Sequence, residues 1–152
     1  MHNNLVTHVL TIIKSHTYHV IISQMEGDKV VNRNVRLSLF SGRNFTGRRL
    51  DFRRAVAVRN LGVFGFNNVL SSFRLSNVVN PNQVTLILFS RTNFRGAFRV
   101  FRGSQNVANL GLFKFDNVTS SFILVGRRLT NAQIAQIQSR GVASLNALEI
   151  SE

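Results

Sequence analysis

Two short polar segments carry the residues of this chain that are best suited to binding chemistry. The first block is residues 67–72 (Asn-Asn-Val-Leu-Ser-Ser) and the second block is residues 116–121 (Asp-Asn-Val-Thr-Ser-Ser). Each block offers amide or carboxylate oxygens, a hydroxyl four positions later and backbone carbonyls between them. Ca²⁺ takes about six to eight oxygen ligands of these kinds. Asn, Asp and Ser are also the usual residues of turns, so each block alone is consistent with either a cation site or a turn.

The sequence contains few residues that could carry out catalysis. There is no cysteine, which excludes disulfides, thiolate metal sites and cysteine catalysis. The six Asp and Glu residues are scattered. All four histidines precede residue 20 and are remote from most of the acids: His2, His8, His16 and His19. No pairing of a nucleophile with a base is visible, and we therefore expect a protein that is not an enzyme.

The two polar blocks occupy the same position in two copies of a tandem repeat. Residues 35–76 align without a gap on residues 84–125 at an offset of 49, and 22 of the 42 aligned positions are identical. Self-similarity at a fixed offset is the signature of a repeat architecture. A segment of about 40 residues cannot bury a core alone, so the two copies must pack on each other.

Each copy has the pattern of a β structure. Apolar and polar residues alternate along residues 35–39, as in a half-buried strand. Turn-rich segments end at Gly47 and Gly96, where a glycine can adopt a positive φ. The strands expected in the first copy lie at residues 35–39, 48–53, 61–66 and 72–75. Four short strands a copy predict a two-sheet sandwich with Greek-key connections.

The flanks differ from the repeats, because all 13 phenylalanines lie between Phe40 and Phe122. We divide the chain into an N-terminal β extension (1–33), the repeat pair (34–126) and a C-terminal segment (127–152). In the extension, Val6–Ile13 and Tyr18–Ser23 are rich in β-branched residues and predict a hairpin. An isolated hairpin is marginally stable in water. It must therefore lie on an edge of its own sandwich or on a neighbouring chain, and we favour the neighbour.

Residues 130–149 predict a helix that Thr130 or Asn131 can cap. Apolar residues recur at helical spacing, at Ile134, Ile137, Leu145 and Leu148, and Gly141 weakens the pattern. This helix either covers an open end of the sandwich or forms an assembly contact.

The formal net charge is +13, and 16 of the 19 basic residues are arginine. The surplus of positive charge either forms a solvated surface or binds a polyanion such as nucleic acid or an acidic polymer. No apolar run approaches the roughly 20 residues of a membrane-spanning helix. The first residues also lack the pattern of a signal peptide.

Two motifs together resemble a known family. The spacings Phe40-x4-Phe45-x-Gly47 and Phe89-x4-Phe94-x-Gly96 are similar to the aromatic hairpin of βγ-crystallin Greek keys. Both polar blocks match that family's N/D-N/D-x-x-S/T-S calcium clamp at every specified position. The resemblance covers residues 34–126 and leaves both flanks unassigned.

The resemblance implies one domain of two Greek keys, related by a pseudo-twofold axis, that binds up to two Ca²⁺ ions. The implied side-chain ligands are Asn67, Asn68, Ser71, Asp116, Asn117 and Ser120. Backbone carbonyls of residues 41–44 and 90–93 would complete the two sites, while Ser72 and Ser121 would fix the hairpins. Because only Asp116 contributes a formal charge and the protein is strongly basic, we expect weak or unequal sites.

These expectations favour a structural protein over an enzyme. The leading hypothesis is a βγ-crystallin-type protein that is stabilised by Ca²⁺ and assembles through its flanks into a coat or filament. Several microbial members of the family serve in spore coats or dormancy, which points to a spore or cell-surface layer. The alternative is a basic module that binds nucleic acid or another polyanion and whose calcium clamps are degenerate.

Overall fold

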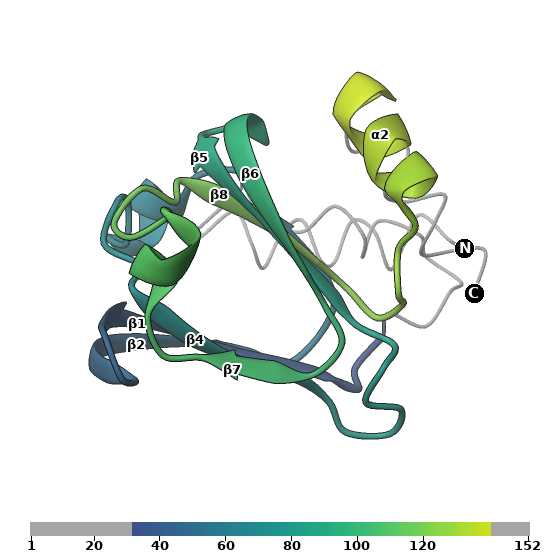
Figure 1. The fold of residues 1–152 in the computed structure, drawn as a ribbon, viewed down its shortest axis with the longest axis horizontal. Helices are drawn as coiled ribbons and strands as arrows, with labels where there is room; N and C mark the ends of the chain where they lie inside the picture. The colour runs from purple at the N-terminus through teal and green to yellow at the C-terminus, as the bar shows by residue number, and fades with distance from the viewer. Residues whose placement is uncertain (1–31, 141–152) are drawn as a thin grey trace, which may run out of the picture.

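The computed structural model describes residues 32–140 (Figure 1). The predicted hairpin at Val6–Ile13 and Tyr18–Ser23 lies outside the described residues. The part of the predicted C-terminal helix that contains Gly141, Leu145 and Leu148 also lies outside them.

The fold is a sandwich of two four-stranded antiparallel sheets (Figure 1). The first sheet has the strand order β2-β1-β4-β7 and the second has the order β3-β8-β5-β6. The predicted Greek-key sandwich of eight strands is therefore confirmed. The strands are β1 (Val35–Gly42), β2 (Thr46–Phe52), β3 (Val56–Val58), β4 (Ser72–Asn77), β5 (Thr85–Arg91), β6 (Arg95–Arg102), β7 (Gln105–Val107) and β8 (Ser121–Val125).

The two copies of the repeat exchange their third strands. Strand β3 of the first copy pairs with β8 of the second, and β7 of the second copy pairs with β4 of the first. Backbone hydrogen bonds between the copies also occur in matched pairs. The amide of Asn68 donates to the carbonyl of Thr119, and the amide of Asn117 donates to that of Leu70, both at 3.0 Å. Neither copy completes a sheet alone, and the two copies pack on each other as the size of one repeat predicts.

The prediction of a third strand at residues 61–66 is wrong. The strand lies earlier, at β3, and Leu61–Phe64 forms a 3₁₀ helix, η2. The side chain of Asn60 accepts a hydrogen bond from the amide of Gly62 at 2.8 Å and so begins the turn. Gly65 ends it in the left-handed conformation, with φ 68°. Leu61 and Phe66 are both buried, although a strand would place side chains five positions apart on opposite faces.

The second copy repeats this arrangement in η3 (Leu110–Phe113), where Asn109 provides the same cap. One difference is that the left-handed position after η3 is occupied by Lys114, with φ 56°, in place of a glycine. Left-handed backbone is unfavourable for a lysine by about 1–2 kcal/mol. The second copy is therefore locally more strained than the first.

The core lies between the sheets and is built from inward-facing residues of both copies. Most of these residues occupy equivalent positions in the repeat. Large members in four equivalent pairs are Phe66, Phe73, Phe115, Phe122, Leu37, Leu39, Leu86 and Leu88, each with at most 2% of its surface exposed.

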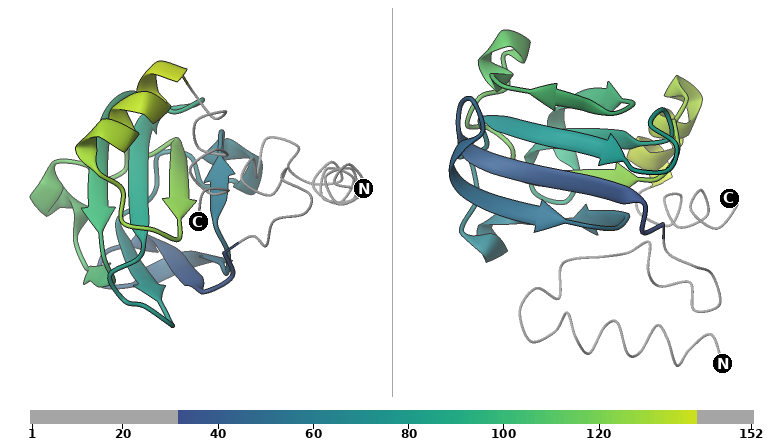
Figure 2. Two further views of the ribbon diagram at one scale, coloured as in Figure 1. Left: turned by 90° about the vertical axis from the view of Figure 1, so that its right-hand side faces the viewer. Right: turned by 90° about the horizontal axis from the view of Figure 1, so that it is seen from below.

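A second apolar cluster lies on the outer face of the second sheet, where helix α2 (Asn131–Arg140) covers it (Figure 2). Ile134 and Ile137 of the helix are buried against a set that includes Ile87 and Ile123 of the sheet. The C-terminal helix therefore covers a sheet face, and not an end, of its own sandwich. Its predicted cap is confirmed, because the hydroxyl of Thr130 accepts a hydrogen bond from the amide of Gln133 at 3.1 Å.

The repeat alignment explains why, within residues 32–140, a helix covers the second sheet and not the first. At the outward positions where the second copy has Ile87 and Ile123, the first copy has Ser38 and Arg74. The outer face of the first sheet is consequently polar. The helices between residues 32 and 140 are all too short to cross a membrane.

Candidate metal centre

The two polar blocks follow the 3₁₀ helices and lead directly into β4 and β8. At the second position of each block the backbone turns into the left-handed conformation, with φ 59° at Asn68 and φ 60° at Asn117. Asparagine tolerates this conformation better than most residues. The Asn in each block therefore has a structural reason to be there in addition to its oxygen.

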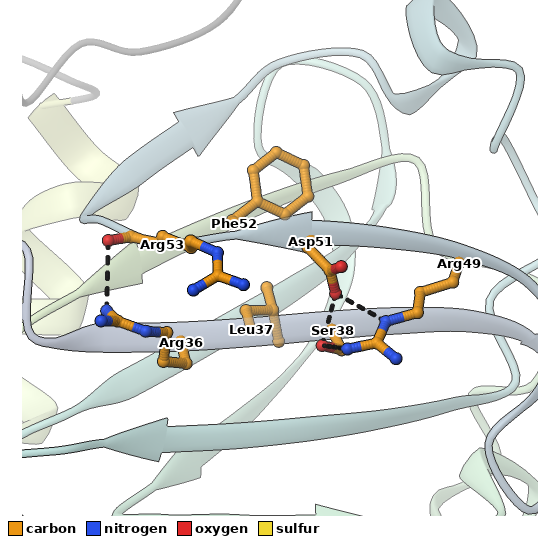
Figure 3. Close-up of a pocket in the computed structure, with 7 residues that line it drawn as sticks. All are labelled: Arg36, Leu37, Ser38, Arg49, Asp51, Phe52 and Arg53. Atoms are coloured by element: carbon orange, nitrogen blue, oxygen red, sulfur yellow. Dashed lines mark hydrogen bonds and ion pairs between the residues drawn. The ribbon is translucent and has the colours of Figure 1, made fainter.

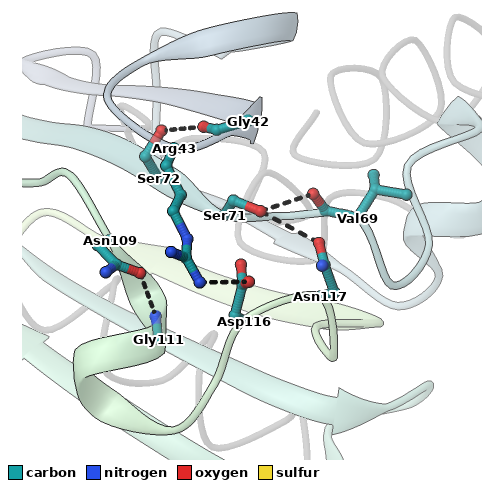
Figure 4. A network of polar contacts seen from close by, with 9 residues as sticks. All are labelled: Gly42, Arg43, Val69, Ser71, Ser72, Asn109, Gly111, Asp116 and Asn117. Atoms are coloured by element: carbon teal, nitrogen blue, oxygen red, sulfur yellow. Dashed lines mark hydrogen bonds and ion pairs between the residues drawn. The ribbon is translucent and has the colours of Figure 1, made fainter.

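The side chains of the two blocks meet crosswise, and Figure 4 shows one of the two contacts, between Ser71 and Asn117. The hydroxyl of Ser71 donates to Oδ1 of Asn117 at 3.1 Å. The hydroxyl of Ser120 donates to Oδ1 of Asn68 at 3.2 Å. Each cluster thus takes its amide from one copy and its hydroxyl from the other, which the separate blocks did not predict.

These contacts, together with the first residue of each block, define two clusters. Clamp A contains Asp116, Asn117 and Ser71, and the hairpin of the first copy lies against it. Clamp B contains Asn67, Asn68 and Ser120, which stand at the repeat positions equivalent to Asp116, Asn117 and Ser71. All six predicted ligand residues therefore fall in these two clusters. Asn67, Asn68 and Asn117 are exposed, whereas Ser71 and Ser120 are buried.

Ser72 and Ser121 fix the hairpins, as the resemblance implied. The hydroxyl of Ser72 donates to the carbonyl of Gly42 at 2.6 Å and accepts from the amide of Phe45 at 2.9 Å. Ser121 makes the matching contacts in the second copy, at 2.6 and 3.0 Å. Gly47 and Gly96 have the predicted positive φ, at 80° and 83°.

The hairpin of the first copy reaches the second copy. The amide of Asn44 donates to the carbonyl of Ala108 at 2.8 Å. The carbonyl of Gly42 already accepts from Ser72, and that of Arg43 accepts from the hydroxyl of Thr46 at 2.6 Å. Two of the carbonyls expected to bind a cation thus have a hydrogen-bond donor, although each carbonyl has a second lone pair.

Asp116 is the only acidic residue in either clamp, and its two oxygens differ. Oδ2 lies 3.5 Å from Nη2 of Arg43, whose side chain is 57% exposed while that of Asp116 is 23% exposed. Oδ1 is buried and has no hydrogen-bond partner among residues 32–140. A buried acceptor without a partner costs about 1–3 kcal/mol, and more when it is charged. This oxygen is therefore suited to a ligand that carries positive charge.

The donor set limits which cations fit. No group of three or more His, Cys, Asp or Glu side chains that could hold a metal ion occurs within residues 32–140. A cation in clamp A would depend on one carboxylate together with amide, hydroxyl and carbonyl oxygens. Such hard, largely neutral ligands fit Ca²⁺ better than a transition metal. Clamp B offers neutral oxygens alone.

Sequence reasoning missed Arg43. The repeat alignment contained the signal, since Arg43 stands where the second copy has Thr92, just as Asp116 stands where the first copy has Asn67. The contact became apparent only when the structure placed the first hairpin beside the second block.

A second polar site is a groove of about 210 Å³ on the outer face of the first sheet (Figure 3). Three arginines line it, with Ser38 and Asp51 between them: Arg36, Arg49 and Arg53. Oδ1 of Asp51 accepts from Ser38 at 2.6 Å and from Nε of Arg49 at 2.8 Å. Burial by itself would raise the pKa of Asp51, but these hydrogen bonds and the charges of Arg49 and Arg53 outweigh it and hold that pKa below its ordinary value of 3.8.

No protein-family profile and no curated protein matches the sequence. Similar solved structures are βγ-crystallin domains. One of them is a structure described under the evolution of the eye-lens βγ-crystallin domain fold. It is 24% identical to this chain with a TM-score of 0.51, and the match covers 65% of this chain and 92% of that one. A βγ-crystallin from Ciona intestinalis is 25% identical over 58% of this chain and 96% of its own, with a TM-score of 0.47. A βγ-crystallin from an archaeon is 19% identical over 62% of this chain and 98% of its own, also with a TM-score of 0.47. The strand order, the matched hairpins and the first of these similarities agree, and the chain has the βγ-crystallin fold.

Proposed function

We propose that this chain is a non-enzymatic structural protein of the βγ-crystallin type that binds Ca²⁺ and is stabilised by it. The observation that carries the proposal is the buried Oδ1 of Asp116, which has no hydrogen-bond partner among residues 32–140. It lies in a clamp whose amide and hydroxyl come from different copies of the repeat. A cation bound there would join the two copies and would favour the folded state.

The expected stabilisation follows from mass action. A ligand that binds only the native state stabilises it by RT ln(1 + [L]/Kd), which is about 2.7 kcal/mol when the ligand is at 100 times Kd. The test is a calorimetric titration of chelator-treated full-length protein with Ca²⁺, together with melting curves in chelator and in millimolar Ca²⁺. We expect heat of binding and a higher melting temperature. If neither signal appears at millimolar Ca²⁺, both polar blocks are turns and not cation sites.

The two clamps should contribute unequally. Asp116→Ala removes the only carboxylate, whereas Asn67→Ala removes a neutral amide at the equivalent position of clamp B. The affinity for Ca²⁺ should fall more in Asp116→Ala, because ligand charge is one determinant of affinity. Equal losses in the two variants would contradict a role for charge.

We also propose that the protein self-assembles into a coat or filament, with residues 1–33 as the contact. Support for this role comes from the sequence of that segment, whose β-branched runs need a surface to lie on. Light scattering of full-length protein over a range of concentrations and salt tests it. Oligomers should persist in high salt, since the contact is apolar, and a monomer at every concentration would end the assembly hypothesis.

The groove on the first sheet favours one second candidate, a polyanion-binding module. Besides the three arginines that line the groove, Arg74 lies exposed on the same face. Several of these guanidinium groups already have partners, however. Nη1 of Arg36 donates to the carbonyls of Arg33 and Val35 at 2.7 and 2.9 Å, and Arg49 pairs with Asp51. This is why the calcium-binding structural role remains our first candidate.

The polyanion candidate makes an opposite prediction about salt. Binding of a labelled single-stranded oligonucleotide, followed by fluorescence anisotropy, should weaken steeply as salt increases, because counterions are released from the phosphates. Arg36→Ala should reduce that binding more than substitution of an exposed arginine on the opposite sheet, such as Arg95→Ala. Absence of binding at low salt would exclude this candidate for nucleic acid.

A further inference from the structure

The two clamps differ in a way that concerns Asp116 and the arginine beside it. In clamp A the carboxylate of Asp116 faces the guanidinium of Arg43, with 3.5 Å between Oδ2 and Nη2 (Figure 4). In clamp B the equivalent positions hold Asn67 and Thr92, neither of which is charged. The carboxylate and the arginine therefore occur together in one clamp and are both missing from the other.

We propose that Arg43 is a built-in counter-ion that competes with Ca²⁺ for Asp116 and so determines the calcium affinity of clamp A. The inference deepens the proposed function, on which it rests. Without Ca²⁺, Arg43 neutralises the carboxylate and holds the first hairpin against the second copy. With Ca²⁺, the guanidinium must leave Oδ2 before a cation can use that oxygen.

The geometry supports competition rather than a permanent replacement of the cation. Arg43 pairs with one oxygen only, since Oδ1 remains without a partner in the part of the chain that is described. Its side chain is 57% exposed, so the guanidinium can move into water at little cost. Nη2 also lies over the backbone of η3, 3.4 Å from the place where a Cβ on Gly111 would be. The arginine thus occupies space at the mouth of clamp A.

Charge adds to this steric effect. A guanidinium a few ångströms from a divalent cation repels it, and two unit charges at 4 Å interact by about 1 kcal/mol even in water. Removal of Arg43 eliminates both the repulsion and the competition. Calcium affinity at clamp A should therefore increase about tenfold, the change that corresponds to roughly 1.4 kcal/mol.

The test compares four full-length proteins by calorimetric Ca²⁺ titration and by melting curves in chelator. They are the wild type, Arg43→Thr, Arg95→Thr and the double variant Arg43→Thr/Asp116→Asn. Each threonine is the residue that the other copy has at the same position. The Arg95→Thr control removes the same charge from the other hairpin, which separates a general charge effect from the contact with Asp116.

We expect about tenfold tighter binding in Arg43→Thr and less than a twofold change in Arg95→Thr. The double variant should lose the gain, because the gain acts through Asp116. In chelator, Arg43→Thr should melt at a lower temperature than the wild type by a few degrees at most, as an exposed ion pair contributes little.

The outcomes separate the inference from the proposed function. Equal Ca²⁺ affinity in the wild type and Arg43→Thr would overturn the inference while calcium binding stands. The inference would also be overturned if Arg95→Thr increased the Ca²⁺ affinity as much as Arg43→Thr does. It would be overturned, too, if the double variant kept the higher affinity of Arg43→Thr. Binding in Arg43→Thr alone would support the inference and overturn calcium binding as a property of the natural chain. No binding in any of the four proteins would overturn both.

Discussion

The cover that α2 provides for the second sheet can be tested at Ile137. This side chain is 2% exposed and packs in the outer apolar cluster. Ile137→Ala removes three carbons, and at about 0.8 kcal/mol for each buried carbon the loss is about 2.4 kcal/mol. A residual cavity adds to this, so we expect a total of about 2–4 kcal/mol. For a chain of this size the melting temperature should fall by about 4–16 °C.

Gln136→Ala is the matched control, because Gln136 is the exposed neighbour on the same helix and alanine is a good helix former. It should leave the melting temperature unchanged. In Ile137→Ala, looser docking should also uncover the apolar face, which an increase in binding of a hydrophobic dye would detect. A melting temperature for Ile137→Ala within a degree of the wild type, with no added dye binding, would refute the packing of α2 on the second sheet.

Three further substitutions test the backbone and the polar face. Lys114→Gly should raise the free energy of unfolding, measured by chemical denaturation, by about 0.5–1 kcal/mol. Glycine relieves the left-handed strain, as Gly65 does at the equivalent position of the first copy. The control Lys114→Ala removes the charge but keeps the strain, and it should show no gain. Gly96→Val should lower the free energy of unfolding by more than about 2 kcal/mol, since φ is +83° and a Cβ would lie 2.3 Å from Oγ of Ser90. A variant as stable as the wild type would contradict the conformation of this hairpin. Because the pKa of Asp51 is lowered in the folded state, its stabilising contribution is present above about pH 4 and is lost as the pH falls through the folded-state pKa. The stability of Asp51→Asn should therefore fall less steeply with acid than that of the wild type. Identical loss of stability in acid would show that the ion pair of Asp51 contributes nothing.

The features that follow from local pattern were predictable from the sequence. The strand at residues 35–39 shows in its alternation, and the positive φ of Gly47 follows from the turn around it. The repeat itself predicted that the two copies must pack on each other, although not that β3 and β7 would change sheets. Strand exchange depends on pairings between residues 30 or more positions apart, such as Leu75 with Gln105 and Val58 with Phe122, which no local pattern contains.

The wrong third strand has a specific cause. The apolar residues of this segment suggest a short strand, but Leu61 and Phe66 are both buried and the four residues between them are partly exposed or exposed, which is not the period of a strand. The decisive residue was Asn60, whose side chain caps the turn through the amide of Gly62. An Asn followed two positions later by Gly favours a cap or a turn over a strand, and the same pair recurs at Asn109 and Gly111.

The candidate site shows where the repeat is most informative. Positions that are identical in the two copies, such as Ser72 and Ser121, make identical contacts and fix the fold. Positions that differ, such as Arg43 and Thr92, stand on matching backbone but carry different charge. An exchange of residues between the copies therefore changes the chemistry of one clamp on a backbone that already accommodates the new side chain. For the same reason, a loss of calcium affinity in such a variant reports on the ligands and the charge around them, and not on a damaged fold.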